Sequence, residues 1–328
     1  MTPAARALFA GMFDYAGLFP PAQLPIDPAI RTYCRDRIGP DAWMLGRFIC
    51  PTSRLPELSP YRDELFRVSP PVRFSALGRG ASATAGLAES VRADLAELSA
   101  FEALHEGRVR VEAYELRLPA ELTADACTAE LVRALEDVVR AFCGEGRRTT
   151  AFSFEIALGS VNPEHIANLV SGLSFAELRL NSPAARRPAP ALKLRCGGVK
   201  AADFPPVEIV ATAIRRCAEA RVPFKCTAGL HHPFRRLDAG IGAWMHGFVN
   251  VFLGAILARE HDLTEQQIGE LLSDSASDSF QFSPDGAVWR ELAVSTDEIA
   301  DARASFATSL GTCSFDEPRE DLRSAGVL

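Results

Sequence analysis

Lysine is almost absent from this 328-residue sequence. Of its 35 basic residues only Lys193, Lys200 and Lys225 are lysines, and the others are arginines. Arginine keeps its proton at any useful pH, whereas a lysine amine can lose its proton when it is desolvated or lies beside another cation. Chemistry that needs a neutral amine can therefore come from only these three side chains.

Three further absences each exclude a class of protein. The longest apolar stretch, residues 247–258, is too short to cross a bilayer, and the N-terminus lacks a signal-peptide pattern. The formal net charge of −7 provides no basic excess for a nucleic-acid backbone. The eight cysteines include no CxxC pair, so we expect reduced core thiols rather than disulfides or a zinc site. We expect a cytoplasmic protein that binds a small molecule, and neither nucleic acid nor membrane.

Short apolar runs alternate with stretches of helical spacing along most of the chain. The clearest helix is expected to follow Asp203 as its N-cap, with prolines in its first turn. Such alternation indicates βαβ units, and seven or eight of them in roughly 210 residues favour a closed barrel over an open sheet. Strands are expected at residues 44–50, 72–77, 108–118, 151–158, 191–196, 223–228 and 247–253; residues 176–181 form either another strand or part of an irregular insertion that continues to residue 190.

No repeat or Gly/Ser linker divides the chain, so the sequence predicts one α/β domain over residues 1–328. We expect a (β/α)8 TIM-type barrel that need not be regular, with its core at 41–260. Residues 1–40 would form an N-terminal extension, and 261–328 C-terminal helices and a lid. The extensions, which carry Asp14, Asp316 and Glu317, are expected to cover one barrel mouth, although surface caps would explain them almost equally well. The oligomeric state is left open, a homo-oligomer included.

Alternation along a parallel strand decides which side chains face the barrel interior. Apolar positions alternate with Lys193 and Arg195 in the run 191–196 and with Lys225 and Thr227 in the run 223–228. Buried charges are costly unless they are paired or functional, so a polar interior indicates either an active site or a structural ion-pair network. The expected interior set is Glu112, Glu155, Lys193, Arg195, Lys225 and Thr227, with Arg47 and Asn250 as further candidates.

Two adjacent histidines, His231 and His232, follow the Lys225 run in the segment FKCTAGLHHP, at the expected catalytic mouth. Histidine can act as a general acid or base, stabilise an oxyanion or bind a metal. Neighbouring side chains of an extended chain point in opposite directions, so we expect one histidine in the site and the other in a structural role. A loop-capping hydrogen bond would explain either one without a function. The remaining candidates for substrate binding are Gly197, Gly198, Gly229 and His246.

The segments KLRCGG at 193–198 and KCTAGL at 225–230 resemble the paired lysine strands of the deoxyribose-phosphate aldolase group of class I aldolases. The resemblance implies that Lys193 forms an imine with the substrate and that Lys225 lowers the pKa of its amine. It is confined to residues 193–230. Arg195 replaces a small hydroxyl residue, and His231 and His232 stand where the aldolases have a glycine-rich phosphate loop, which puts a phosphorylated substrate in question.

A wider set of motifs resembles a family of bacterial conserved proteins, and this likeness implies no particular chemistry. The set spans the chain and comprises FDYAGLFPPA, LGRF, KLRCGG, FKCTAGLHHP, HGFVNVF and TCSFDEP.

The leading hypothesis is a Schiff-base carbon–carbon lyase that needs no cofactor and acts on a small anionic substrate. Lys193 would attack the carbonyl carbon, and Lys225 would keep that amine partly neutral. Glu155 or Glu112 would move protons, and Arg195 would hold the anionic group.

Two alternatives remain open at this point. One is a hydrolase or lyase that uses a divalent metal bound by His231, His232 and Glu155, with Glu112 nearby. The other is a barrel without catalytic activity that only binds a small anion.

Overall fold

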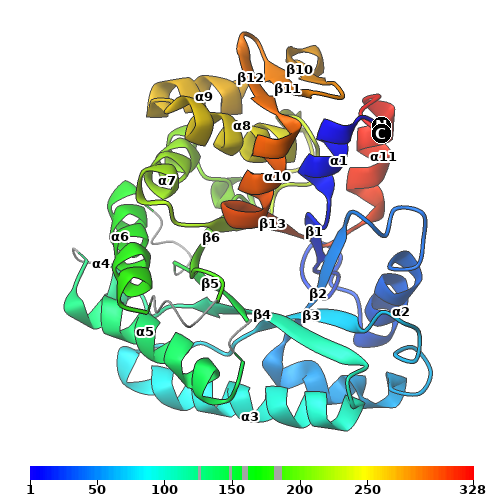
Figure 1. Ribbon diagram of the computed structural model, residues 1–328, viewed down its shortest axis with the longest axis vertical. Coiled ribbons are helices and arrows are strands. Elements are labelled where there is room, and N and C mark those ends of the chain that lie inside the picture. The colour runs from blue at the N-terminus through cyan, green and yellow to red at the C-terminus, as the bar shows by residue number, and fades with distance from the viewer. Residues whose placement is uncertain (125–126, 148–149, 157–161, 181–186) are drawn as a thin grey trace. The chain divides into compact units, whose positions relative to one another are not determined.

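Eight parallel strands close into a barrel in the computed structural model, which describes residues 1–124, 127–147, 150–156, 162–180 and 187–328 (Figure 1). This confirms the predicted α/β barrel of the TIM type. The strands are β1 (Phe13–Tyr15), β2 (Leu45–Pro51), β3 (Val72–Leu77), β4 (Val109–Arg117), β5 (Ala151–Glu155), β6 (Ala191–Arg195), β7 (Phe224–Thr227) and β13 (Ala307–Thr312). Their order around the barrel is β1-β13-β7-β6-β5-β4-β3-β2.

The chain divides into two compact units. Unit 1 comprises Met1–Gln23, Trp43–Gly46 and Leu194–Leu328, and unit 2 comprises Leu24–Ala42 and Arg47–Lys193. The expectation of a single domain stays a prediction.

Unit 2 consists of most of β2, strands β3 to β5, the start of β6, the helix that precedes β2 and the helices that follow β3, β4 and β5. Thr128 caps α5 by accepting a hydrogen bond from the Leu131 amide at 3.1 Å. The apolar stripe of α5 then packs on the sheet, where the Phe142 and Phe152 rings meet edge to face at 5.1 Å. The helices of this unit are α2 (Ile26–Asp36), α3 (Leu87–His105), α4 (Glu121–Ala124), α5 (Ala129–Gly144) and α6 (Pro163–Leu180), with 3-10 turns at Thr52–Tyr61 and Thr84–Gly86.

Strand β4 contains a bulge that decides which of its side chains share a face. Val111 lies opposite Phe74 of β3, but Ala113 lies opposite the next residue, Ser75, so Glu112 is an extra residue in β4. The alternation along β4 therefore shifts by one residue after Glu112. As a result, Glu115 lies on the same face as Ser75.

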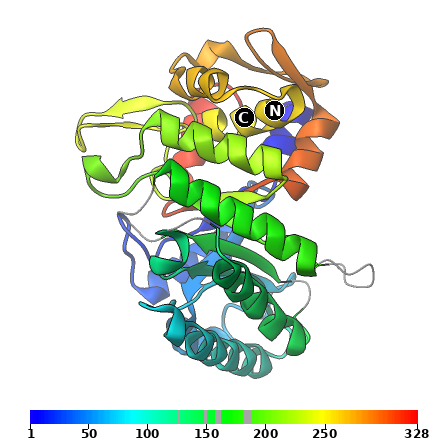
Figure 2. The ribbon, with the colours of Figure 1, turned by 90° about the vertical axis from the view of Figure 1, so that its left-hand side faces the viewer.

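Unit 1 is arranged around β13, which pairs in parallel with β1 on one side and with β7 on the other. Figure 2 shows its helices and the three-stranded antiparallel sheet β10-β11-β12, drawn in orange. The helices are α1 (Pro3–Phe9), α7 (Val207–Ala220), α8 (Phe248–His261), α9 (Glu265–Ser273), α10 (Thr296–Ser305) and α11 (Asp316–Ser324), with 3-10 turns at Ala201–Asp203 and Ser277–Ser279. The remaining strands are β8 (Arg236–Asp238), β9 (Ala243–Met245), β10 (Phe280–Phe282), β11 (Gly286–Trp289) and β12 (Leu292–Ser295).

One predicted strand, and one segment left open between a strand and an irregular insertion, are helical instead. The run 247–253 belongs to α8, whose side chains from Phe248 to Ala258 are all buried. An apolar run that is buried on every side gives the same signal for a helix as for a strand, so periodicity could not separate them. Residues 176–180 end α6, while residue 181 and most of the predicted insertion lie outside the described residues, as do residues 157 and 158 of the expected fourth strand.

Several predicted boundaries also need correction. Asp203 ends a 3-10 turn, and α7 begins only at Val207, because a residue that precedes a proline disfavours helical backbone. Strands β1 and β13 lie in the segments expected to be an extension and a lid, so the predicted core at 41–260 is too narrow. The three-residue β1 is too short for an alternation pattern to reveal.

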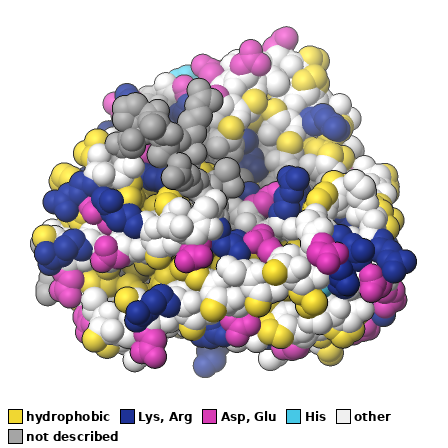
Figure 3. All heavy atoms as spheres, turned by 60° about the horizontal axis from the view of Figure 1, so that its bottom comes forward, with side chains coloured by type: hydrophobic (Ala, Val, Ile, Leu, Met, Phe, Trp, Pro, Cys, Tyr) yellow, Lys and Arg dark blue, Asp and Glu magenta, His cyan; other side chains and the backbone are white. Residues whose placement is uncertain are grey.

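Charged side chains of both signs share the surface. Basic and acidic side chains are interspersed on the face shown in Figure 3. Unit 2 contains ion pairs such as Arg54–Glu57 and Arg62–Glu106. Within the ranges described above, no helix combines the length and the apolar character needed to cross a membrane.

Candidate functional site

The Lys193 amine of unit 2 lies between two buried carboxylates. Its Nζ is 2.9 Å from Glu115 Oε2 and 2.8 Å from Glu155 Oε2. Lys193 is 6% exposed, Glu155 2% and Glu115 0%. The Ser75 hydroxyl donates a hydrogen bond of 2.6 Å to Glu115 Oε1, and Arg117 Nη2 lies 3.7 Å from Glu155 Oε1. We call these five residues the Lys193 cluster.

The strand register explains why these side chains meet. Lys193 is directly opposite Glu155 in the β5–β6 pair, and Glu115 is opposite Ser153 in the β4–β5 pair. Each of these residues lies in the second half of its strand or at its middle, toward the carboxyl end where barrel enzymes place their active sites. The prediction that Lys193 and Glu155 lie on the same face of neighbouring strands is therefore confirmed.

Sequence reasoning missed Glu115 because the bulge reverses the alternation within β4. It named Glu112 instead, which forms an ion pair of 3.2 Å with Arg47 Nε and is about as exposed as that arginine. The structure thus brings together two other predicted residues, Arg47 and Glu112, in a pair of their own. One signal could have revealed Glu115, since the apolar residues Tyr114 and Leu116 flank it directly.

The Lys193 cluster combines opposite charges in equal number. Glu115 and Glu155 carry two negative charges, and the Lys193 amine and the Arg117 guanidinium carry two positive charges. Carboxylates at hydrogen-bond distance favour the charged form of an amine, and they can also accept its proton. The arrangement can hold an anion, transfer protons, or supply an amine nucleophile whose proton passes to a neighbouring carboxylate.

Unit 1 contains a second buried lysine with its own partner. Lys225 Nζ is 2.9 Å from Asp14 Oδ2, and the Ser309 hydroxyl donates to the same oxygen at 2.8 Å. All three residues are at most 3% exposed, and a Cβ at Gly46 would collide with Asp14. Alternation correctly predicted that Lys225 is a buried strand residue, but it could not predict a partner 211 positions away.

The two lysines belong to different units, so the expectation that they share a pocket stays a prediction. Each amine contacts at least one carboxylate of its own unit. The activation predicted from the sequence relied on neighbouring positive charge, whereas the contacts around Lys193 within unit 2 are with carboxylates. Any loss of the Lys193 proton would therefore have to use these acceptors.

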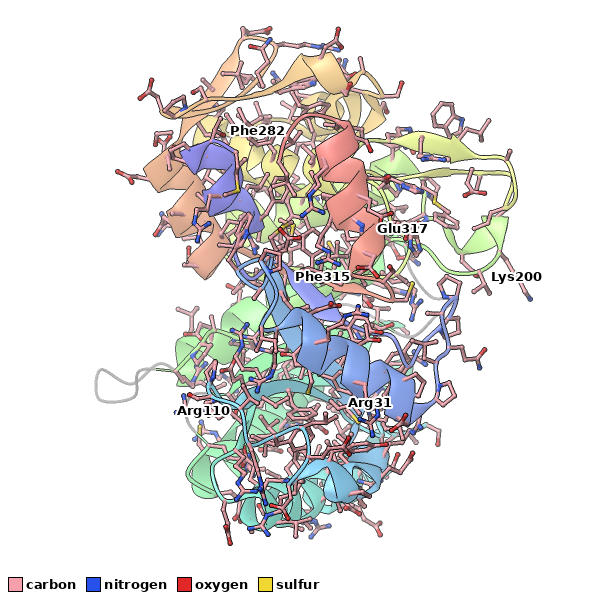
Figure 4. All side chains as sticks on the ribbon, turned by 90° about the vertical axis from the view of Figure 1, so that its right-hand side faces the viewer. Arg31, Arg110, Lys200, Phe282, Phe315 and Glu317 are labelled. Atoms are coloured by element: carbon pink, nitrogen blue, oxygen red, sulfur yellow. The ribbon has the colours of Figure 1, made fainter. Side chains whose placement is uncertain are left out.

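Both histidines of the loop after β7 contact helix α11, whose start is marked in Figure 4 by the labels of Phe315, just before the helix, and Glu317 in its first turn. His231 Nδ1 lies 3.1 Å from Glu317 Oε2, and His232 Nδ1 lies 2.5 Å from Asp321 Oδ2. Hydrogen bonds with the Cys313 thiol and then with Glu317 raise the pKa of His231 to about 10. The hydrogen bond with His231 in turn lowers the pKa of Glu317. At Nδ1 the two histidines thus have the same kind of partner, and the expected division of roles between them stays a prediction.

Two further candidates have structural roles. His246 is 1% exposed, its Nε2 lies 2.8 Å from the Pro205 carbonyl oxygen, and burial lowers its pKa. Asn250 lies on α8, not on a strand, where its side chain accepts from the Arg235 amide and donates to the carbonyls of Leu271 and Asp274. The hydrogen bonds of Asn250 connect α8 to the loop at Arg235 and to the end of α9.

The glycines near the ends of β6 and β7 bring two loops into contact. Gly229 has φ +72°, and a Cβ there would lie 2.6 Å from Gly197 Cα. A Cβ at Gly197 would also meet the Phe204 ring, and one at Gly198 would meet Asp203. Close loop packing therefore accounts for glycine at these positions, where the sequence suggested approach to a ligand. Arg195 Nη1 donates to the Gly197 carbonyl at 3.3 Å, and Thr227 ends β7 in a half-buried position.

A metal site is a separate question. In the portion of the chain that is described, no group of three or more His, Cys, Asp and Glu side chains is arranged to hold a metal ion. His231 and His232 belong to unit 1 and Glu155 to unit 2, so the proposed ligand set stays a prediction.

Comparison with protein-family models and with curated proteins returned no match. The resemblances to deoxyribose-phosphate aldolases and to a bacterial protein family therefore stay predictions, and what the site can do is argued from its geometry.

Proposed function

We propose that the protein is a carbonyl-chemistry enzyme, a Schiff-base carbon–carbon lyase in which Lys193 forms the imine. The observation that carries the proposal is the position of Lys193 Nζ, 2.8 Å from Glu155 and 2.9 Å from Glu115, on strands of a TIM-type barrel. A charged amine that is almost completely buried needs either a structural or a chemical reason. Two carboxylates at this distance supply the proton acceptor that imine formation requires.

The two glutamates have different surroundings, which suggests different roles. Glu115 accepts a hydrogen bond from Ser75, which helps to hold it as the negative partner of the site. Glu155, the last residue of β5, would accept the Lys193 proton and return it to the hydroxyl group that leaves as water when the imine forms. The same carboxylate would then take the proton of the substrate hydroxyl as the carbon–carbon bond breaks.

A small anionic substrate fits this cluster. The Arg117 side chain is 48% exposed and lies 3.7 Å from Glu155, so its guanidinium can bind a carboxylate or phosphate of the substrate. The role expected for Arg195 as an anion-binding residue stays a prediction. No cofactor is needed for the proposed steps.

Borohydride reduction tests the imine directly. The protein would be incubated with pyruvate, glyceraldehyde, glyceraldehyde 3-phosphate or dihydroxyacetone phosphate, reduced, digested and mapped by mass spectrometry. We expect a reduced adduct on the Lys193 peptide and none in Lys193→Arg, which keeps the charge but cannot form an imine. Lys200→Arg is the matched control, because Lys200 projects from the surface of unit 1 (Figure 4). If no compound of the panel labels Lys193, the lyase proposal is wrong.

One observation favours a second candidate, an anion-binding barrel without catalysis. Two carboxylate partners stabilise the ammonium form of Lys193, and a permanently charged amine beside Arg117 would bind an anion without reacting. This candidate predicts thermal stabilisation by pyruvate or inorganic phosphate that persists in Lys193→Arg, together with the absence of any borohydride adduct.

Two earlier expectations remain proposals, one about location and one about an alternative reaction. A cytoplasmic location agrees with eight free thiols, because reducing compartments keep cysteines unpaired. A metal-dependent reaction through His231 and His232 stays an alternative, and elemental analysis of protein purified without chelators would support it by finding a divalent metal in stoichiometric amount.

A further inference from the structure

Cys313, His231 and Glu317 of unit 1 form a cluster that the proposed lyase does not use. The strand pair β7–β13 brings them together, because Thr227 is opposite Gly311 and the two chains continue from there into the histidine loop and Cys313. Helix α11 then starts at Asp316 and presents Glu317 in its first turn. The cluster therefore lies where two neighbouring parallel strands end.

The contacts follow the order thiol, imidazole, carboxylate. Glu317 Oε2 lies 3.1 Å from Nδ1 of His231, and the His231 ring also has a hydrogen bond with the Cys313 thiol. In nucleophilic catalysis a base oriented by a third group activates the attacking atom in the same order. The other charged groups that act on Glu317 are His232, whose partner is Asp321, and Arg236.

Access and charge both suit a nucleophile. Cys313 is 9% exposed, while the side chains of His231 and Glu317 are 13% and 38% exposed, so the cluster opens to solvent at its carboxylate end. The raised pKa of His231 means that its imidazolium form is present at neutral pH. An imidazolium beside a thiol stabilises the thiolate, and the start of a helix a few residues away acts in the same direction.

We propose that Cys313 is a nucleophilic cysteine, paired with His231 and oriented through Glu317, that accepts an acyl group from an activated ester or thioester. The thiolate attacks the acyl carbon, a carbon–sulfur bond forms, and the bond to the leaving group breaks. His231 gives its proton to the leaving group, which departs as an alcohol or thiol. Water then attacks the thioester while His231 takes a proton, and the products are a carboxylic acid and the restored thiolate–imidazolium pair.

Alkylation by iodoacetamide at pH 7, followed by peptide mapping, is the first test. The comparison thiol is Cys143 of unit 2, which is half-buried and therefore at least as accessible as Cys313. We expect the Cys313 peptide to be alkylated at least about tenfold faster than the Cys143 peptide, because a histidine beside a thiol increases its reactivity.

Two histidine variants make a matched pair for this test. His231→Gln removes the thiol's partner, and we expect the alkylation rate of Cys313 to fall at least about tenfold. His232→Gln also removes a histidine–carboxylate contact with α11, but it leaves the Cys313–His231 hydrogen bond in place, so the alkylation rate of Cys313 should stay unchanged. Alkylation of Cys313 no faster than that of Cys143 in the unmodified protein, or an unchanged rate for Cys313 in His231→Gln, would overturn the proposal.

Acylation is the second test, and it does not depend on any variant that might fold poorly. The full chain is mixed with p-nitrophenyl acetate at pH 6.5, and we expect an initial burst of nitrophenol and an acetyl group on the Cys313 peptide. Absence of the acetyl group from that peptide would refute the acyl-transfer role. Cys313→Ser should abolish the burst and leave borohydride labelling of Lys193 unchanged, so this proposal and the lyase proposal can fail separately.

Discussion

Removal of the Lys193 ammonium should be among the most destabilising single changes in unit 2. In Lys193→Met the carboxylates of Glu115 and Glu155, which are at most 2% exposed, lose their shared partner. Breaking a buried ion pair by removing one member costs about 3–5 kcal/mol, because the remaining charge is left in a poorly solvated place. We expect a decrease of this size in the free energy of unfolding at pH 8, measured by urea denaturation.

The pH dependence tests the cause of this loss. Without the ammonium, the two carboxylates bind protons more readily in the folded variant than in the unfolded chain, where glutamate has a pKa of about 4.3. A carboxyl group whose pKa is higher in the folded protein than in the unfolded chain stabilises the folded protein at low pH, and this contribution disappears as the pH rises. The deficit of Lys193→Met relative to the unmodified protein should therefore shrink from pH 8 toward pH 5.

Two further variants complete the test. Lys200→Met removes an exposed ammonium and should change stability by less than about 0.5 kcal/mol. The triple variant Lys193→Met, Glu115→Gln, Glu155→Gln also removes the two carboxylates that lack an ammonium partner. It should regain part of the lost free energy of unfolding. If Lys193→Met loses under about 1 kcal/mol at pH 8, or no more than Lys200→Met, the view of the Lys193 cluster as a buried charged network is refuted.

The remaining predictions concern other buried groups. Lys225→Met leaves Asp14 buried without its ammonium and should lower the free energy of unfolding by about 3–5 kcal/mol in urea titrations, and a loss under about 1 kcal/mol would contradict the pairing. The pKa of His231 is raised to about 10, so its stabilising contribution is complete below about pH 6.5 and disappears as the pH rises through 10; His231→Gln should flatten this part of the stability profile. His105 packs against Phe101 and Phe66, its ring nitrogens lack a hydrogen-bond partner among the described residues, and burial lowers its pKa to about 4. Its contribution is present above about pH 6.5 and is lost as the pH falls toward 4, so His105→Phe should raise the melting temperature at pH 5, and an unchanged value would contradict this account.

Strand alternation in the sequence was enough to place several residues of the candidate site. It predicted that Lys193 and Lys225 are buried strand residues and that Glu155 shares the face of Lys193, because apolar residues that pack against helices leave the intervening positions for the other face. It failed for Glu115, since a bulge adds one residue to β4 and no periodic pattern reveals it.

The sequence by itself determined the alternation of strands and helices and the burial of two lysines, since these follow from local apolar patterns. Only the tertiary structure decided the partners of those lysines and of His231. Asp14 lies 211 positions from Lys225, and Glu317 lies 86 positions from His231. Such contacts form because parallel strands bring distant segments of the chain side by side, and local propensity carries no information about which carboxylate will arrive there.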